Sequence, residues 1–112
     1  MKFWTEKKIL WAAMLIYIIF FGIFTSLRHY NFQTQAWDMG IFSQTLWNTT
    51  QGRFMTNALE GVKLEGIKNH FGVHMSPFLI LLAPGYALFP NPYYLLIIQT
   101  IALALGALPI YL

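Results

Sequence analysis

An uncharged apolar segment near the start of the chain limits the fold more than any other feature. It runs from Ile9 to Leu27 and contains no Asp, Glu, Lys or Arg. As an α-helix it spans about 28 Å, close to the ~30 Å hydrocarbon core of a bilayer. A cleaved signal peptide is the rival interpretation. Its apolar region is usually about 7–15 residues long, however, and no A-x-A-like cleavage site follows here. We therefore expect a retained transmembrane helix over residues 9–27.

The composition agrees with a membrane protein and excludes several other classes. Hydrophobic residues make up 57% of the chain and charged residues only 10%, whereas soluble domains carry about 25% charged residues. The basic residues are scattered and form no stripe that could follow a phosphate backbone, which argues against nucleic-acid binding. The absence of cysteine excludes disulfides, zinc ribbons and thiol catalysis.

The charge distribution predicts how the chain crosses the membrane. Lys2, Lys7 and Lys8 precede the first apolar segment, so the positive-inside rule places the N-terminus in the cytoplasm. A second apolar stretch over residues 91–112 is long enough to cross back. We therefore expect a multi-pass protein of the cell membrane, with residues 28–90 as an outward loop. No basic flank closes the second span, so we expect residues 1–112 to be the N-terminal segment of a larger membrane domain.

Within the loop we expect two helices that lie along the membrane surface. The first runs from Asp38 to Gln51, with Asp38 as its N-cap and Gly52 just after its last turn. It carries an apolar face suited to a membrane surface, which comprises Met39, Phe42 and Leu46, widened by Ile41 and Trp47. The second lies between Pro77 and Pro90 and, at about 18 Å, is too short to cross.

Between these helices lies a short internal repeat. "LEGVK" at residues 59–63 is followed by "LEGIK" at residues 64–68, and its simplest interpretation is a hairpin of two similar strands. The predicted fold class is therefore an all-α membrane protein. Two transmembrane helices flank an outward loop with two membrane-parallel helices and one short hairpin.

Asp38 is the first candidate for chemistry. It is the only acidic residue between Glu6 and Glu60. An Asp at a helix start caps free N–H groups and suits the helix dipole, which is a purely structural role. It also lies where a lipid-borne substrate would arrive, and neighbouring aromatic side chains such as Trp37 can partly desolvate it and tune its basicity. From spacing alone both roles stay open.

The stretch "NHFGVHMSP", residues 69–77, supplies further candidates. His70 and His74 are four residues apart, a spacing that puts both on one helix face and that occurs among metal ligands, although no third ligand is evident. Three roles remain open: ordinary hydrogen bonding, binding of an anionic phosphate, and metal binding. Arg53 can contact a lipid phosphate or can simply be solvated.

The order of these parts resembles the start of the DUF2079 family of polytopic membrane proteins. The resemblance covers nearly the whole chain. It rests on the D-x-G-x-F-x-Q-x-x-W pattern from Asp38 to Trp47 and on the H-x-S-P element from His74 to Pro77.

DUF2079 proteins are similar in turn to GT-C glycosyltransferases, in which the first outward loop carries a catalytic or metal-contacting acid and two helices along the membrane. Asp38 matches the position of that acid. The resemblance implies a polyprenyl-phosphate sugar donor, makes Arg53, His70 and His74 candidates near its phosphate, and allows a divalent metal. It also implies that the rest of the polytopic chain is needed to close the donor site, so that this segment is inactive alone.

Two other classes compete with a glycosyltransferase. The chain can be a small non-enzymatic membrane protein or a subunit of a complex, with Asp38 as a helix cap. A transporter segment is less favoured, because neither predicted span contains an ionisable residue such as transport pathways require.

Overall fold

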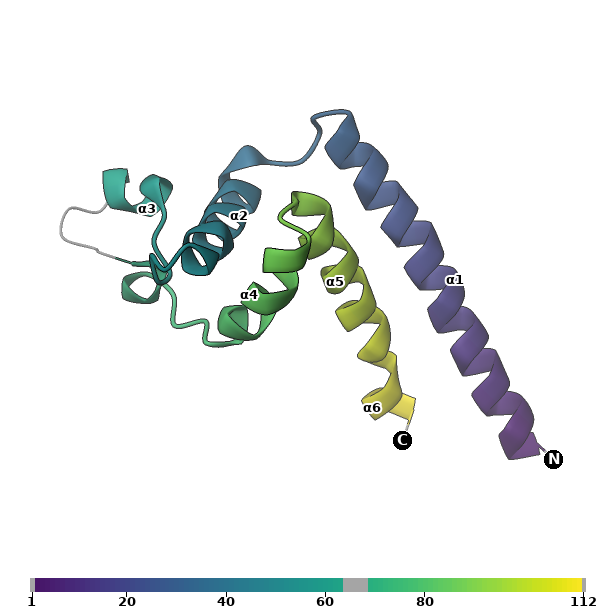
Figure 1. Ribbon diagram of the computed structural model, residues 1–112. Helices are drawn as coiled ribbons and strands as arrows, with labels where there is room; N and C mark the ends of the chain where they lie inside the picture. The colour runs from purple at the N-terminus through teal and green to yellow at the C-terminus, as the bar shows by residue number, and fades with distance from the viewer. Residues whose placement is uncertain (1, 64–68, 112) are drawn as a thin grey trace. The chain divides into compact units, whose positions relative to one another are not determined.

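A computed structural model describes residues 2–63 and 69–111 of the chain. All regular elements of the described part are helices and none is a strand, which confirms the all-α class. Its elements, labelled in Figure 1, are α1 (Lys2–Tyr30), α2 (Ala36–Thr50), α3 (Ala58–Lys63), η1 (His70–Gly72), α4 (Phe78–Leu88), α5 (Pro92–Leu105) and α6 (Ala107–Tyr111).

The chain divides into two compact units, which are described separately. The first comprises Met1–Gln33 and Leu95–Leu112, and the second comprises Thr34–Tyr94. The first unit therefore holds α1, most of α5 and α6. The second holds the loop elements and the first turn of α5, including every candidate functional residue named above.

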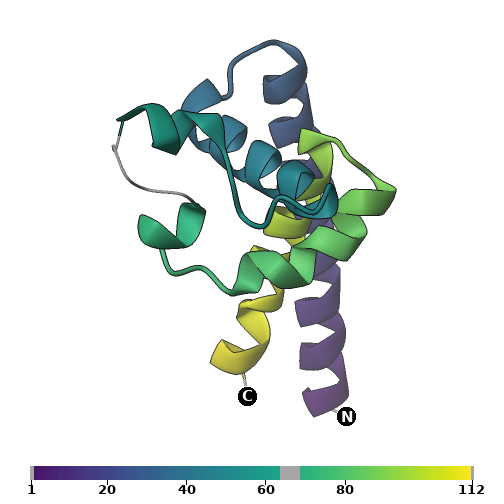
Figure 2. The same cartoon turned by 60° about the vertical axis from the view of Figure 1, so that its left-hand side comes forward.

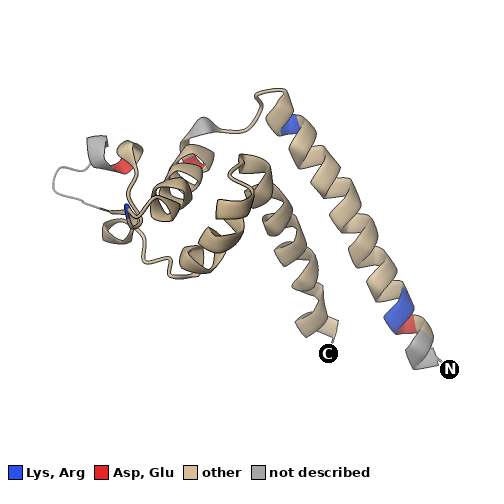
Figure 3. Cartoon of the chain, in the orientation of Figure 1, with Lys and Arg blue, Asp and Glu red and all other residues tan. Residues whose placement is uncertain are grey.

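Two helical stretches are long and apolar enough to cross a membrane. They are Thr5–Tyr30, with a mean hydropathy of 2.2, and Pro92–Tyr111, with a mean hydropathy of 1.9. The first extends the expected segment 9–27, and the second lies within the expected stretch 91–112. Charged residues lie only near the two ends of α1, and α4, α5 and α6 carry none (Figure 3). Large apolar side chains on α1, such as Ile16 at 67% and Phe20 at 60%, are exposed. Lipid is the solvent that suits such a surface.

The helix α1 ends in a Schellman motif with an unusual residue at its key position. The Gln33 N–H donates to the Arg28 carbonyl over 2.9 Å, and the Phe32 N–H donates to the His29 carbonyl over 3.0 Å. This closure requires a left-handed residue, which is usually glycine. Here it is Phe32, with φ of 55° and a side chain that is 96% exposed. The backbone at this helix end is therefore strained.

The second span is interrupted near its end by a proline. Pro109 lacks the N–H that would donate to the carbonyl of Leu105, and its ring would clash with that carbonyl. The helix α5 accordingly ends at Leu105, Gly106 forms a turn, and α6 continues to Tyr111.

The second unit is built around the packing of α2 on α4. The two helices lie side by side in Figures 1 and 2 and contact each other. On α2 the buried face comprises Ile41, Thr45 and Leu46, and on α4 it comprises Leu79, Ala83 and Tyr86. Phe42 and Trp47, which were expected on the apolar face of α2, remain partly exposed.

The proline boundaries of α4 are confirmed. Pro77 directly precedes its first residue, Phe78, and the helix ends at Leu88, before Pro90. Its 11 residues span only about 16 Å. Several of its apolar side chains are exposed, including Phe78, Leu81 and Leu88.

The expected hairpin is wrong for its first copy. Residues 59–63 belong to the helix α3 rather than to a strand. Asn57 precedes this helix, and its side-chain oxygen accepts the N–H of Glu60 over 2.9 Å. That bond caps the first turn and favours a helical start. The second copy, residues 64–68, lies outside the described residues.

Candidate functional site

Asp38 is the third residue of α2 and does not cap it. The N-cap is Gln35, which makes no side-chain capping bond, so the prediction of Asp38 as N-cap is wrong. The carboxylate is nevertheless in the first turn, where the helix dipole favours a negative charge. It is exposed and makes no hydrogen bond or ion pair to the described part of the chain. Asp38 is therefore available to a ligand.

The helix α2 ends in a tight turn at Gly52. Gly52 has φ of 79°. Its N–H donates to the Thr49 carbonyl over 3.1 Å, and the Arg53 N–H donates to the Asn48 carbonyl over 2.8 Å. This is a Schellman motif with Gly52 in the left-handed position, which confirms the expected helix end.

Met55 fixes the loop that follows α2. Its side chain is fully buried, and its N–H donates to the Thr49 hydroxyl over 2.9 Å. Its carbonyl accepts the His70 N–H over 2.7 Å. The same residue therefore fastens the loop to α2 on one side and to η1 on the other.

The side chain of His70 is held by Glu60 in the interior of the unit. Nδ1 of the ring lies 3.0 Å from each carboxylate oxygen of Glu60, and the two side chains are 1% and 7% exposed. The edge of the ring meets Phe42, with ring centroids 5.8 Å apart. Burial of two ionisable groups is tolerated because they pair with each other.

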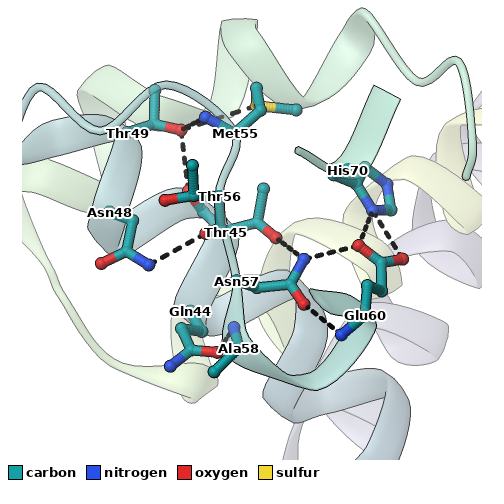
Figure 4. A network of polar contacts seen from close by, with 10 residues as sticks. All are labelled: Gln44, Thr45, Asn48, Thr49, Met55, Thr56, Asn57, Ala58, Glu60 and His70. Carbon is teal, nitrogen blue, oxygen red and sulfur yellow. Dashed lines mark hydrogen bonds and ion pairs between the residues drawn. The ribbon is translucent and has the colours of Figure 1, made fainter. Parts of the chain in front are cut away.

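Asn57 connects this pair to α2 (Figure 4). Its amide nitrogen donates to Oε2 of Glu60 and, over 3.1 Å, to the hydroxyl of Thr45. Thr45 has no exposed surface. A continuous polar chain thus runs from α2 through Asn57 and Glu60 to His70, and it fixes the position of the imidazole.

A cavity of about 350 Å³ brings most of the predicted site residues together. Three of them, Asp38, His70 and His74, line it along with Glu60. The remaining wall is apolar and aromatic, and it is formed by Trp37, Ile41, Phe42 and Val73. A few polar groups in an apolar cavity of this size are typical of small-ligand sites. His74 is exposed, and its ring centroid lies 5.8 Å from that of His70.

Arg53 is not part of this cavity. It follows the last turn of α2, whereas Asp38 lies in the first, and a 15-residue helix is about 22 Å long. Its guanidinium donates to the Asn48 side-chain oxygen over 2.7 Å. Within this unit it therefore cannot contact the same small group as Asp38.

Glu60 lines the cavity but is not among the site residues that the sequence predicts. In the sequence analysis it is interpreted only as part of the repeat at residues 59–68. The available signal was the pattern Asn57-Ala58-Leu59-Glu60, in which a capping residue precedes Glu by three positions, as in a capping box. That pattern predicts a helix start. It does not predict the pairing with His70, which depends on the return of the chain through Met55.

No three His, Asp or Glu side chains of the described residues lie close enough together to hold a metal ion. Asp38, His70 and His74 share a cavity without forming a ligand cluster. A protein-only metal centre of the zinc type therefore does not fit this site, whereas a single carboxylate is compatible with Mg²⁺ bound mainly by phosphates.

Comparison with known families bears on the region that contains this cavity. Residues 28–112 match the family model described as predicted membrane protein (DUF2079). The chain belongs to the DUF2079 family. The match covers α2, α3, η1, α4 and the second span. No curated protein and no solved structure matches this DUF2079 chain.

Proposed function

We propose that this DUF2079 protein contributes the outward loop of a multi-pass membrane glycosyltransferase that uses a polyprenyl-phosphate sugar as donor. The observation that carries the proposal is the exposed carboxylate of Asp38, which lines one cavity with His70 and His74. The chain on either side of this unit continues into a candidate membrane span, so a lipid-borne substrate would reach the cavity from the bilayer. In this proposal the N-terminus is cytoplasmic and the rest of the polytopic chain completes the donor site.

Asp38 acts as the general base in this reaction. Its carboxylate takes the proton of an acceptor hydroxyl, whose oxygen then forms a bond to C1 of the sugar. The bond from C1 to the phosphate oxygen breaks, and the lipid phosphate leaves with the electron pair. General bases contribute about 10²–10⁴-fold to rate. The same carboxylate can instead contact a divalent cation on the donor phosphate, which needs only one or two protein carboxylates.

The other predicted residues take two different places in the proposal. His74 is exposed on the cavity wall, where a ring N–H of its imidazole donates to a phosphate oxygen. Arg53 does not line the cavity, so its partner is a lipid phosphate at the membrane surface rather than the reacting group.

The experiment that tests the proposal is Asp38→Asn in the full-length protein. The change keeps the shape of the side chain but removes its basicity and weakens it as a ligand for a hard cation. We expect normal membrane insertion and a loss of sugar transfer from polyprenyl-phosphate sugars of about 100-fold or more. Glu6→Gln is the matched control, because it neutralises an exposed acid on α1 and should leave transfer unchanged.

Transfer by the Asn variant within a few-fold of wild type would remove Asp38 from the chemistry. The competing assignment, a non-enzymatic membrane protein or complex subunit, would then be favoured, because it needs no catalytic acid. Complete absence of transfer in wild-type membranes with every sugar donor tried would favour the same assignment.

A further inference from the structure

The general-base proposal leaves the second ring nitrogen of His70 without a role. Nε2 is buried and has no hydrogen-bond partner in the described part of the chain, although the residue is only 1% exposed and lines the cavity. Buried polar atoms are nearly always paired, and an unpaired one calls for an explanation.

The pairing of Nδ1 decides what Nε2 can bind. An ionised carboxylate accepts hydrogen bonds and cannot donate them. Because Nδ1 lies 3.0 Å from both oxygens of Glu60, the ring proton belongs on Nδ1. In the neutral ring Nε2 then carries a lone pair and accepts a hydrogen bond, in the tautomer that a carboxylate partner selects.

Hydrogen bonds from neighbouring residues fix Glu60 as the partner of Nδ1. Its backbone N–H is bound by the Asn57 side chain, whose amide nitrogen also donates to the carboxylate. Thr45 anchors that amide from the buried face of α2. The backbone N–H of His70 donates to the Met55 carbonyl, which fixes the part of the chain that carries the ring. The imidazole is therefore positioned before any ligand binds.

We infer that Glu60 and His70 form a positioning pair that presents Nε2 of His70 as a hydrogen-bond acceptor for a hydroxyl group of a ligand in the Asp38 cavity. The carboxylate of Asp38 is also an acceptor, so the cavity offers two acceptors to a ligand that brings hydroxyl donors. Its apolar and aromatic wall, which includes Trp37 and Phe42, suits the C–H face of a ring. A hydroxylated ring, such as a sugar, has both properties.

A hydrogen-bond acceptor at Nε2 favours a hydroxyl ligand over a phosphate. Phosphate oxygens without a proton only accept hydrogen bonds, so they gain nothing from a lone pair on Nε2. His70 is thus assigned to a hydroxylated ligand, and the phosphate contact is left to His74. Nε2 is buried, and the exposed side chain of His74 lies beside the His70 ring, with ring centroids 5.8 Å apart.

The inference rests on the proposed function only in naming this hydroxyl as that of the acceptor substrate. Its test therefore uses no transfer reaction. The full-length protein is labelled with ¹⁵N-histidine in lipid nanodiscs, and the ring nitrogens of His70 are assigned by comparison with the His29→Gln and His74→Gln variants. We expect the Nδ1–H tautomer for His70, with the Nε2 resonance in the range of an unprotonated nitrogen.

Substitutions at Glu60 test the pair directly. Glu60→Gln keeps an oxygen that accepts from Nδ1, so the tautomer should persist. Glu60→Leu removes the acceptor, and the tautomer preference should be lost. His29, which lies on α1, is the internal reference and should not respond to either change. If the Glu60→Leu variant folds and its His70 keeps the Nδ1–H form, the proposed role of Glu60 is wrong. If the variant does not fold, the wild type decides, and an Nε2–H form of His70 there would contradict the proposed role of Glu60.

Ligand binding is tested on the wild type with methyl glycosides of glucose, mannose and galactose, and with dimethyl phosphate, a diester that carries no proton at neutral pH, as the matched probe. At least one glycoside should shift the Nε2 resonance in the direction of an accepted hydrogen bond, and dimethyl phosphate should not. A shift with dimethyl phosphate and none with the glycosides would overturn the inference, as would no shift with any probe. If a glycoside shifts His70 but Asp38→Asn retains transfer, the binding site stands and the general-base proposal fails.

Discussion

The ring of Tyr94 occupies the space that a Cβ atom on residue 85 would need. Gly85 lies on α4, and Tyr94 lies in the first turn of α5. The Tyr94 hydroxyl donates to the Leu82 carbonyl over 3.3 Å, and its ring meets the edge of Tyr86 with centroids 5.9 Å apart. The absence of a side chain at Gly85 therefore allows α4 to pack against the first turn of α5.

We expect Gly85→Ala to destabilise the second unit by about 1–3 kcal/mol, the usual cost of an overpacked contact. The added methyl group must displace Tyr94 and break its bond to α4. Thermal unfolding of the purified protein in detergent measures the loss. Gly22→Ala is the control, because its Cβ would meet Ile97 at an ordinary 3.6 Å. An unchanged melting temperature for Gly85→Ala would show that Tyr94 does not hold α4 against the first turn of α5.

The two Schellman ends of α1 and α2 predict effects of opposite sign. Phe32 and Gly52 take the same left-handed position, with φ of 55° and 79°. Glycine adopts this conformation without strain, whereas other residues pay about 1–3 kcal/mol. Phe32→Gly should therefore raise the melting temperature, and Gly52→Ala should lower it. Gly52 has open space around its Cβ position, so the loss would reflect the backbone alone. The same sign for both changes would contradict this account.

The sequence predicts those features of the fold that depend on neighbouring residues. Gly52 marks the end of α2 and Pro77 and Pro90 bracket α4, because glycine and proline restrict the backbone at the position they occupy. The two spans follow from length and apolar content. The N-cap of α2 was misplaced at Asp38, since Gln35 has no side-chain signal for a cap.

The candidate site could be predicted only in part, because its key contact is tertiary. Asp38 and His74 stood out as polar residues in apolar surroundings. The bond between Glu60 and His70 joins residues ten positions apart, and it depends on Met55 to bring η1 back to the loop. No local sequence pattern predicts the contact between Met55 and His70. The "LEG" repeat predicted a hairpin, whereas Asn57 caps a helix at this point.

The proposed topology predicts which positions can be reached from outside the cell. The chain has no native cysteine, so single cysteines can be introduced without background. Gln51→Cys is exposed at the end of α2 and should react with a membrane-impermeant maleimide in intact cells. Lys8→Cys and Ile110→Cys should react only after the membrane is opened. Strong labelling of both Gln51→Cys and Ile110→Cys in intact cells would contradict two crossings.

Substitutions of Asn57 separate its two functions in the polar network. Asn57 caps α3 through its oxygen and donates to Glu60 through its nitrogen. Asp ranks with Asn as an N-cap, so capping alone predicts that Asn57→Asp is harmless and that Asn57→Ala costs about 1 kcal/mol.

The network predicts the reverse order at neutral pH. Asn57→Asp replaces the donated hydrogen bond with a second carboxylate against the buried Glu60, and like charges in a buried site are strongly unfavourable. Asn57→Ala loses the cap and one bond to a charged group, together about 2–4 kcal/mol, but adds no repulsion. We therefore expect the free energy of unfolding to fall further for Asp than for Ala. Asn57→Ser, which caps without a charge, is the control and should be the mildest of the three. If Asp proves as stable as Asn, the Glu60 carboxylate is not the charged, hydrogen-bonded partner that the tautomer of His70 requires.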